Sequence, residues 1–297
     1  MNSIKNKQDK SINNLPVILL SVVVSCKGVG STLLLQLEAL KNQSLDKKLW
    51  QAVFLFREET AGRKNKASLK QALSLIKRSF PFSKILFLKE EQPLCEMRNL
   101  AFEHLNSPYL YFIDEDIILE DFHHLSRLIE LHQQYPELTV LGGSYLNHPN
   151  STFWGNCYNW IVRLWVKAHK TSDHKDFVPA GNLSVKHRKT FQARFYTPCG
   201  FGAEELYFLK ELHQRGLMSY ADKALDVPHL AQHTFRDFIQ RAWLHGKNLP
   251  QQKAGSKRLF FKEPAGLIVK MAGLFYLLLT RISAVWSQLK FLFSKTA

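Results

Sequence analysis

Apolar and polar positions alternate in blocks along the first half of the chain. Short apolar runs rich in β-branched and aromatic residues, which are typical of buried strands, occur at 17–25, 50–56, 84–88 and 109–114. Segments with helical spacing of apolar residues lie between them, at 31–43, 67–80 and 93–106. This alternation predicts an α/β fold with a mostly parallel central sheet and flanking helices.

The pattern is less regular in the second half. It predicts a helix over 122–135, a strand over 138–146, an amphipathic aromatic stretch over 154–170 and a strand or turn over 177–185. A glycine turn then leads into a helix within 200–216, and a basic helix follows over 235–246. No internal repeat interrupts this order.

The segment 264–293 is the most hydrophobic part of the chain. Three cations leave it without an uninterrupted run of about 18 apolar residues, as a typical membrane-spanning helix has. At about 100° per residue, Lys270, Arg281 and Gln288 fall on one line of a helix, and apolar residues occupy the other faces. We expect an amphipathic helical tail in the interface of an anionic membrane. A helix packed on the domain or in a dimer, and a true span, are the alternatives.

The distribution of charge also favours an anionic partner for the tail. The 297 residues carry a formal net charge of +15, and residues 251–297 hold eight Lys or Arg against the single acid Glu263. Such a balance favours an anionic partner, which could be lipid, a phosphorylated small molecule or nucleic acid. Because no nucleic-acid-binding motif is present, we expect no nucleic-acid partner.

Composition also suggests how the chain is divided. Residues 1–15 are polar and lack the apolar core of a signal peptide, which predicts a flexible leader. One folded domain is expected over 16–250 and the tail over 251–297. The four cysteines are widely spaced and form no CxxC pair, so a reducing cytoplasm fits better than a disulfide or zinc framework.

Acidic residues end the strand predicted at 109–114. Asp114, Glu115 and Asp116 follow an apolar run and precede another, at the strand edge where parallel sheets bind ligands. Hard divalent cations such as Mg²⁺ or Mn²⁺ bind one or two carboxylates together with substrate phosphates. The triplet is therefore either a solvated turn or a cation site.

Other candidates are weaker when taken alone. Glu204 and Glu205 open a helix after a glycine turn, so they either cap that helix or supply a general base. Arg98 could pair with an acid on its helix or contact a phosphate or the acidic triplet. His229 and His233 lie before the basic helix, where either could join a metal or phosphate site or simply lie at the surface.

The motifs occur together in a recognisable order. "SVVVSCKG", "RNLAF…SPYLYFIDED", "PAGNLSV", "GFGAEELYFLKELHQRG" and "VPHLAQHTFRDFIQRAWLHGK" follow one another over about 17–250. The series resembles the family-two inverting glycosyltransferases of the GT-A fold. The resemblance implies a DxD motif at Asp114 and Asp116, with Asp116 as the metal ligand and Asp114 nearer the nucleotide ribose.

The resemblance also implies further roles. Arg98 and Asn182 would lie near the nucleotide and the donor sugar, and His229, with His233 as the alternative, would lie near the diphosphate. Glu205 stands where the family has its catalytic aspartate, with Glu204 beside it. Glu58 or Glu59 would replace the acids that the family carries after its second strand, a departure that leaves the nucleotide base open.

These assignments imply a metal-dependent, inverting transfer from a nucleotide-diphosphate sugar to a hydroxyl of a glycan or lipid-linked acceptor. Mn²⁺ or Mg²⁺ would be the cofactor. The expected location is the cytoplasm, at the inner face of the cytoplasmic membrane. Two other functions remain open at this point, a nucleotidyltransferase acting on a sugar phosphate and a non-catalytic protein that binds the membrane surface.

Overall fold

The computed structural model describes most of the predicted domain and the apolar part of the tail. The residues described are 18–26, 30–57, 66–89, 93, 95–187, 192–197, 202–248 and 265–294, and the side chains of 66–68 and 289–294 are not described. The predicted leader, residues 1–15, lies outside these ranges, as do Glu58 and Glu59. The division into leader, domain and tail stays a prediction.

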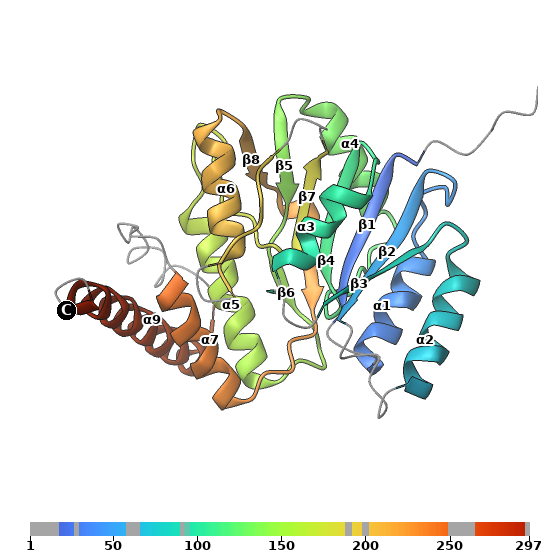
Figure 1. Cartoon of the computed structure of the whole chain (residues 1–297). Coiled ribbons are helices and arrows are strands. Elements are labelled where there is room, and N and C mark those ends of the chain that lie inside the picture. The colour runs from blue at the N-terminus through green and yellow to red at the C-terminus, as the bar shows by residue number, and fades with distance from the viewer. Residues whose placement is uncertain are drawn as a thin grey trace, which may run out of the picture.

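Strands and helices alternate through the first half of the structure (Figure 1). The strands are β1 (Leu20–Cys26), β2 (Trp50–Arg57), β3 (Lys84–Leu88), β4 (Tyr109–Asp114), β5 (Leu138–Gly142), β6 (Tyr145–Asn147), β7 (Asn182–Lys186), β8 (Met218–Ala221) and β9 (Val227–His229). The helices are α1 (Ser31–Lys41), α2 (Lys66–Ser79), α3 (Cys95–His104), α4 (His124–Gln134), α5 (Phe153–Ala168), α6 (Glu204–Gln214), α7 (Phe235–Asn248) and α9 (Leu267–Ser294). The predicted α/β class with flanking helices and a C-terminal apolar helix is confirmed.

The central sheet has seven strands in the order β3-β2-β1-β4-β7-β5-β8. β1, β2, β3 and β4 are parallel, as are β5 and β8, and β7 runs antiparallel to both of its neighbours. Since β7 points the opposite way, its first residues lie beside the last residues of β4, where Ile113 pairs with Asn182. The segment before β7 therefore reaches the same sheet edge as the acidic triplet.

One predicted strand is wrong in its extent. The run 138–146 forms β5 in the central sheet and β6 in a separate two-stranded sheet with β9. The glycine pair Gly142–Gly143 lies between them, where the chain leaves the large sheet. A Cβ at Gly143 would lie only 2.2 Å from the Leu225 carbonyl, so the passage requires a residue without a side chain.

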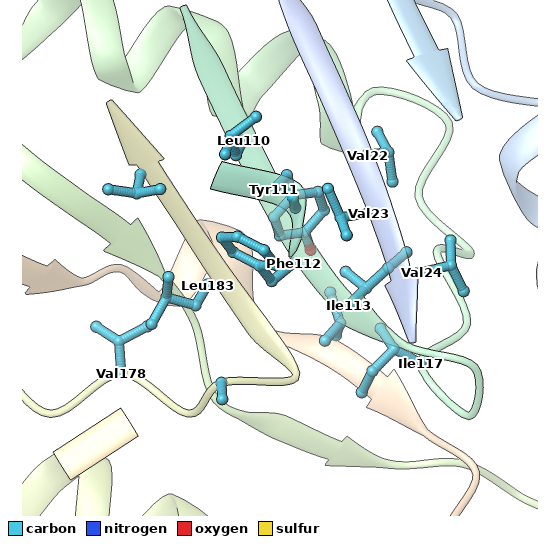
Figure 2. Close-up of a cluster of buried hydrophobic side chains, with 14 of the residues drawn as sticks. Val22, Val23, Val24, Leu110, Tyr111, Phe112, Ile113, Ile117, Val178 and Leu183 are labelled. Atoms are coloured by element: carbon cyan, nitrogen blue, oxygen red, sulfur yellow. The ribbon is translucent and has the colours of Figure 1, made fainter. Parts of the chain in front are cut away.

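The core of the sheet is a continuous apolar layer. Side chains of β1, β4 and β7 meet there, and Val23, Phe112 and Leu183 have no solvent exposure (Figure 2). The edge strand β3 is more exposed, which fits its shorter apolar run. Burial of this kind contributes roughly 25 cal/mol per Å² of apolar surface, and it is the main force that holds the strands together and so positions their ends.

Helix α9 lies against α7, at the end of the molecule opposite α1 and α2 (Figure 1). It also contacts α5. The segment Leu267–Gln288 within it is long and apolar enough to cross a membrane by length and composition. Its packing against α5 and α7 places this tail helix next to the walls of the site described below.

Candidate active site

The acidic triplet forms a tight turn at the end of β4. The Ile117 amide donates to the Asp114 carbonyl (3.0 Å), and the Leu230 amide donates to the Asp116 carbonyl (2.8 Å). The side chains of Asp114 and Asp116 are only 27% and 15% exposed. These carboxylates are therefore held largely away from water, which is not the environment of a solvated turn.

Arg98 of α3 joins this turn to the opposite side of the cavity. Its Nη2 lies 2.7 Å from Asp114 Oδ1 and its Nη1 lies 2.9 Å from Glu204 Oε1. The Arg98 side chain is 6% exposed, and Glu204 is 14% exposed. Burial lowers the pKa of Arg98, but the two carboxylates outweigh it and the net shift is upward. Arg98 is therefore a permanent cation shared by both sides.

The glutamate pair begins α6. Ala203, the residue before the helix, has a left-handed backbone (φ 63°), and Gly202 before it also has a positive φ of 81°. This turn directs the first residues of α6 into the cavity. Burial, and next the negative charge of Glu204, raise the pKa of Glu205 to about 8. Glu205 thus titrates close to neutral pH, which suits a group that must accept a proton.

His229, at the end of β9, faces Asp116. Its Nε2 lies 3.5 Å from Asp116 Oδ1, and its Nδ1 lies 2.6 Å from Asn159 Oδ1. The Asn159 amide nitrogen donates to the His229 carbonyl (3.0 Å), which leaves Asn159 Oδ1 as an acceptor. His229 Nδ1 must then carry the proton, and in the neutral ring Nε2 presents its lone pair to Asp116.

These groups line one cavity. Its empty space, counted together with the open solvent at its mouth, is about 880 Å³. The four acids and Arg98 lie on it together with a second set of residues, which comprises Tyr145, Tyr158, Trp165, Phe177, His229, Arg241 and His245. Acidic, basic and aromatic surfaces therefore face one another across a single space, an arrangement that suits a substrate with both anionic and carbohydrate-like parts.

The sequence profile of glycosyl transferase family 2 matches residues 21–195, more than half of the chain. The chain belongs to glycosyl transferase family 2. No curated protein matches this glycosyltransferase at a significant level. The predicted family is thereby confirmed, and it favours glycosyl transfer over the nucleotidyltransferase and non-catalytic alternatives.

Solved structures with a similar fold are also glycosyltransferases. The mannosyltransferase PcManGT from Pyrobaculum calidifontis, in complex with GDP-Man and Mn²⁺, aligns with a TM-score of 0.57 at 11% identity, over 94% of this chain and 75% of that one. S. aureus TarS 1–349 aligns with a TM-score of 0.51 in complexes with UDP (14% identity, 88% and 71% of the two chains) and UDP-GlcNAc (12%, 88% and 80%). At such low identity these likenesses concern the fold, which is of the GT-A type.

The remaining predicted residues of this glycosyltransferase lie in different places. Asn182 is fully buried, accepts a hydrogen bond from the Tyr111 hydroxyl (2.7 Å) and donates one to the Leu225 carbonyl (2.8 Å). Its neighbour Gly181 lines the cavity instead, where a Cβ would lie 2.8 Å from Asp114 Oδ2. His233 is buried beside Tyr158, and the cavity lining contains His229 rather than His233.

Two cavity residues were missed by reasoning from the sequence. Arg241 of α7 lies over the Tyr158 ring, 5.2 Å from its centroid, and His245 follows one turn later. Burial, reinforced by the charge of Arg241, lowers the pKa of His245 to about 3, so this ring is neutral. The available signal was helical spacing, because Arg241 falls among residues of α7, such as Phe238 and Ala242, that are buried.

The donor atoms fit a divalent metal held jointly with a substrate. Among the described residues, no three His, Cys, Asp or Glu side chains gather closely enough to hold a metal by themselves. Asp116 Oδ1 and His229 Nε2 nevertheless lie 3.5 Å apart, so a carboxylate oxygen and an imidazole nitrogen are within reach of one cation. Adjacent ligands of an octahedral Mg²⁺ lie about 3 Å apart, and substrate phosphates commonly complete its shell.

Proposed function

We propose that this glycosyltransferase moves a sugar, with inversion, from a nucleotide-diphosphate sugar to a hydroxyl of a glycan or lipid-linked acceptor, and that it requires Mn²⁺ or Mg²⁺. The observation that carries the proposal is the meeting of two acid pairs on one cavity. Asp114–Asp116 and Glu204–Glu205 face that cavity from different elements, and Arg98 binds one member of each pair.

The strand-end acids form the donor side. Asp116 and His229 are the residues that would hold the divalent metal, with Asp114 beside them and Arg98 and Arg241 as further cations near the diphosphate. When bound, the metal would neutralise charge on the departing diphosphate. The GDP-Man, UDP and UDP-GlcNAc in the structures of similar fold support a nucleotide-sugar donor.

The helix-start acids form the acceptor side. Glu205 accepts the proton of the acceptor hydroxyl while that oxygen attacks the anomeric carbon from the face opposite the leaving diphosphate. One base suffices because no protonated acid is needed for the leaving group, in contrast to glycosidases with their two carboxylic acids. A single displacement of this kind inverts the anomeric centre.

The rest of the cavity fits a sugar-bearing acceptor. Tyr158, Trp165 and Phe177 give it an aromatic wall, and apolar ring faces of sugars pack well on such surfaces. A cytoplasmic location at the inner face of the membrane belongs to the same proposal. The described cysteines Cys26, Cys95 and Cys157 are buried and free, which agrees with a reducing compartment.

The experiment that tests this function is product analysis. The full chain is incubated with a panel of nucleotide sugars, Mn²⁺ and candidate acceptors, and the products are analysed by chromatography and NMR. Release of a nucleoside diphosphate, with a glycoside of inverted anomeric configuration, is expected. Retention of configuration would refute the single displacement. Pyrophosphate release from a nucleoside triphosphate and a sugar phosphate would indicate the nucleotidyltransferase instead.

A further inference from the structure

Helix α9 has its large apolar residues on the wrong side for a helix in water. The face toward α5 and α7 carries small or hydroxylated residues, and Ala272, Tyr276, Thr280 and Ser283 are buried there. The opposite face, called here the outer face, is exposed throughout. It consists of Leu267, Met271, Leu274, Leu278, Ile282 and Val285. A helix of a water-soluble domain normally turns its large apolar side chains inward.

Specific contacts fix this orientation. A Cβ at Gly273 would lie 2.2 Å from the Trp160 ring, so the helix approaches α5 closely only where it lacks a side chain. Ser283 Oγ donates to the Trp243 carbonyl of α7 (2.7 Å), and Tyr276 Oη lies 2.8 Å from His245 Nδ1. Turning α9 over would break these hydrogen bonds and bury bulky residues where only small ones fit. The packing of the inner face therefore leaves the outer face exposed.

The charge around α9 indicates which class of partner suits the outer face. Lys270 and Arg281 fall on one line at the border of the outer face, and residues 251–297 carry eight Lys or Arg against one Glu. Two copies meeting through their outer faces would bring these like charges together. Anionic lipid headgroups complement them, and acyl chains complement the apolar stripe. The pattern therefore favours a bilayer over a second copy of the chain.

The packing of α9 also distinguishes a helix that crosses a bilayer from one that lies in its plane. Its buried residues run from Ala272 to Ser283, so α7 accompanies the middle of the helix. α7 exposes Arg236 and Lys247. If α9 crossed the membrane, these charges would be drawn into hydrocarbon, which strongly disfavours them. Lying in the membrane plane keeps α7 in water.

We propose that α9 lies in the plane of an anionic bilayer, with its outer face at the acyl boundary and Lys270 and Arg281 among the headgroups. His245, on the cavity wall, contacts the inner face of α9 through Tyr276. The bilayer then begins roughly one helix diameter, about 10 Å, from the cavity. A cavity this close to the bilayer suits an acceptor whose hydroxyl is carried by a membrane amphiphile, a step that rests on the proposed function.

Vesicle co-sedimentation tests the docking surface without using activity. The full chain is mixed with vesicles of equal parts phosphatidylcholine and phosphatidylglycerol, or of phosphatidylcholine alone. Leu278→Glu on the outer face is expected to weaken binding to the anionic vesicles about tenfold or more. The matched control is Phe122→Glu, since Phe122 is as exposed (58% against 54%) but lies beside the end of α1.

The outcomes separate the partners. Strong binding to anionic vesicles, weaker binding to phosphatidylcholine and at high salt, and loss in Leu278→Glu alone support the proposal. Equal binding by both variants overturns it. So does a wild-type dimer in sedimentation velocity that Leu278→Glu dissociates, if the vesicles bind neither form. Circular dichroism and thermal unfolding of each variant show that folding is intact.

Depth-dependent quenching by brominated lipids tests the orientation. Trp286 and Ile268 lie 18 residues apart on the same line of α9, which is about 27 Å along the axis, and both are exposed. Tryptophan fluorescence is compared between wild type, Trp286→Phe and Trp286→Phe with Ile268→Trp. Equal, shallow depths at the two positions support the in-plane helix, and depths that differ by most of that length overturn it in favour of a span.

Discussion

The two acid pairs of the cavity are built alike but held differently. Each pair has one member bound by Arg98, which is Asp114 in one and Glu204 in the other. The second members differ, because Asp116 lies 3.5 Å from His229 whereas burial beside Glu204 raises the pKa of Glu205 to about 8. The two carboxylates thus differ in environment, and the proposed roles, cation binding for Asp116 and proton transfer for Glu205, follow that difference.

The elements that carry the pairs explain this difference. The strand-end turn is pinned by backbone hydrogen bonds on both sides of Asp116, which places its carboxylate rigidly next to His229. Glu205 instead follows a left-handed turn at the start of α6, where it is desolvated against a like charge. Desolvation and like charge disfavour the anion, and fixed cationic neighbours favour it. Environment, more than the carboxyl group itself, distinguishes Asp116 from Glu205.

Among the variants that test this difference between the acid pairs, Glu205→Gln should have the largest effect on turnover. Without the base, turnover should fall about 10²–10⁴-fold, while nucleotide-sugar binding measured by calorimetry stays near that of wild type. Glu204→Gln is the matched control on the same turn and should lose less, since its carboxylate is paired with Arg98. A larger loss in Glu204→Gln than in Glu205→Gln would exchange the two roles.

Arg98→Met tests the cation that the two pairs share. Removing it leaves two largely buried carboxylates without their ion pair, so the free energy of unfolding should fall by about 3–5 kcal/mol in urea titrations. Arg194→Met is the control, because its ion pair with Glu103 is exposed and should contribute no more than about 1 kcal/mol. Similar losses in both variants would mean that the cavity does not depend on Arg98.

The pKa of Glu205 predicts a rising pH profile. With the pKa raised to about 8, only about a tenth of the free enzyme has the base form at pH 7, so kcat/KM should increase nearly tenfold per pH unit up to about pH 7 and level off above about pH 8. A plateau already reached at pH 6 would contradict this.

The same shift has a consequence for stability. The folded chain holds the Glu205 proton more tightly than the unfolded chain, whose pKa is near the ordinary 4.5, so the free energy of unfolding should decrease between pH 4.5 and about 8. Glu205→Gln removes this contribution. Its melting temperature should rise relative to wild type as the pH rises across that window.

Asn159→Ala tests the donor side of the comparison. Asn159 accepts the Nδ1 proton of His229 and so fixes the ring with Nε2 toward Asp116. Loss of such an orienting group commonly costs about 10–100-fold in metal affinity. Mn²⁺ titration in the presence of nucleoside diphosphate, followed by electron paramagnetic resonance, measures it. Unchanged affinity would remove His229 from the metal proposal and leave Glu205 untouched.

The pattern of apolar residues predicted the strands in the first half of the molecule. Apolar runs that end abruptly in polar residues marked β1, β2, β3 and β4, and the acids after β4 fell at the expected sheet edge. Such strands are buried on both faces, so their hydrophobicity is continuous and visible in the sequence. The candidate acids at Asp114, Asp116, Glu204 and Glu205 followed from the same signals and from the family resemblance.

Spatial partnerships were harder to foresee. Arg98 had several open partners in the sequence, and the structure pairs it with carboxylates 16 and 106 residues away. The direction of β7, the separation of β5 from β6, and the approach of Arg241 to the cavity likewise depend on how distant segments pack. Residue pattern carries burial and periodicity, but which buried surfaces meet is decided by tertiary packing.

The antiparallel strand β7 also sets an order of assembly. β1, β2, β3 and β4 lie within the first 114 residues and are neighbours in the sheet, whereas β7 joins β4 after an intervening stretch that includes β5 and α5. Closing that loop requires contacts far apart in the sequence, and the chain emerges from synthesis with its N-terminal strands first, so we expect this step to be the slower one. In pulsed hydrogen exchange during refolding, we expect the amides of β1 and β4 to be protected before those of β7 and α6. In that order Arg98 would meet Asp114 early and Glu204 late, so the proposed proton-transfer site would be completed at the end of folding.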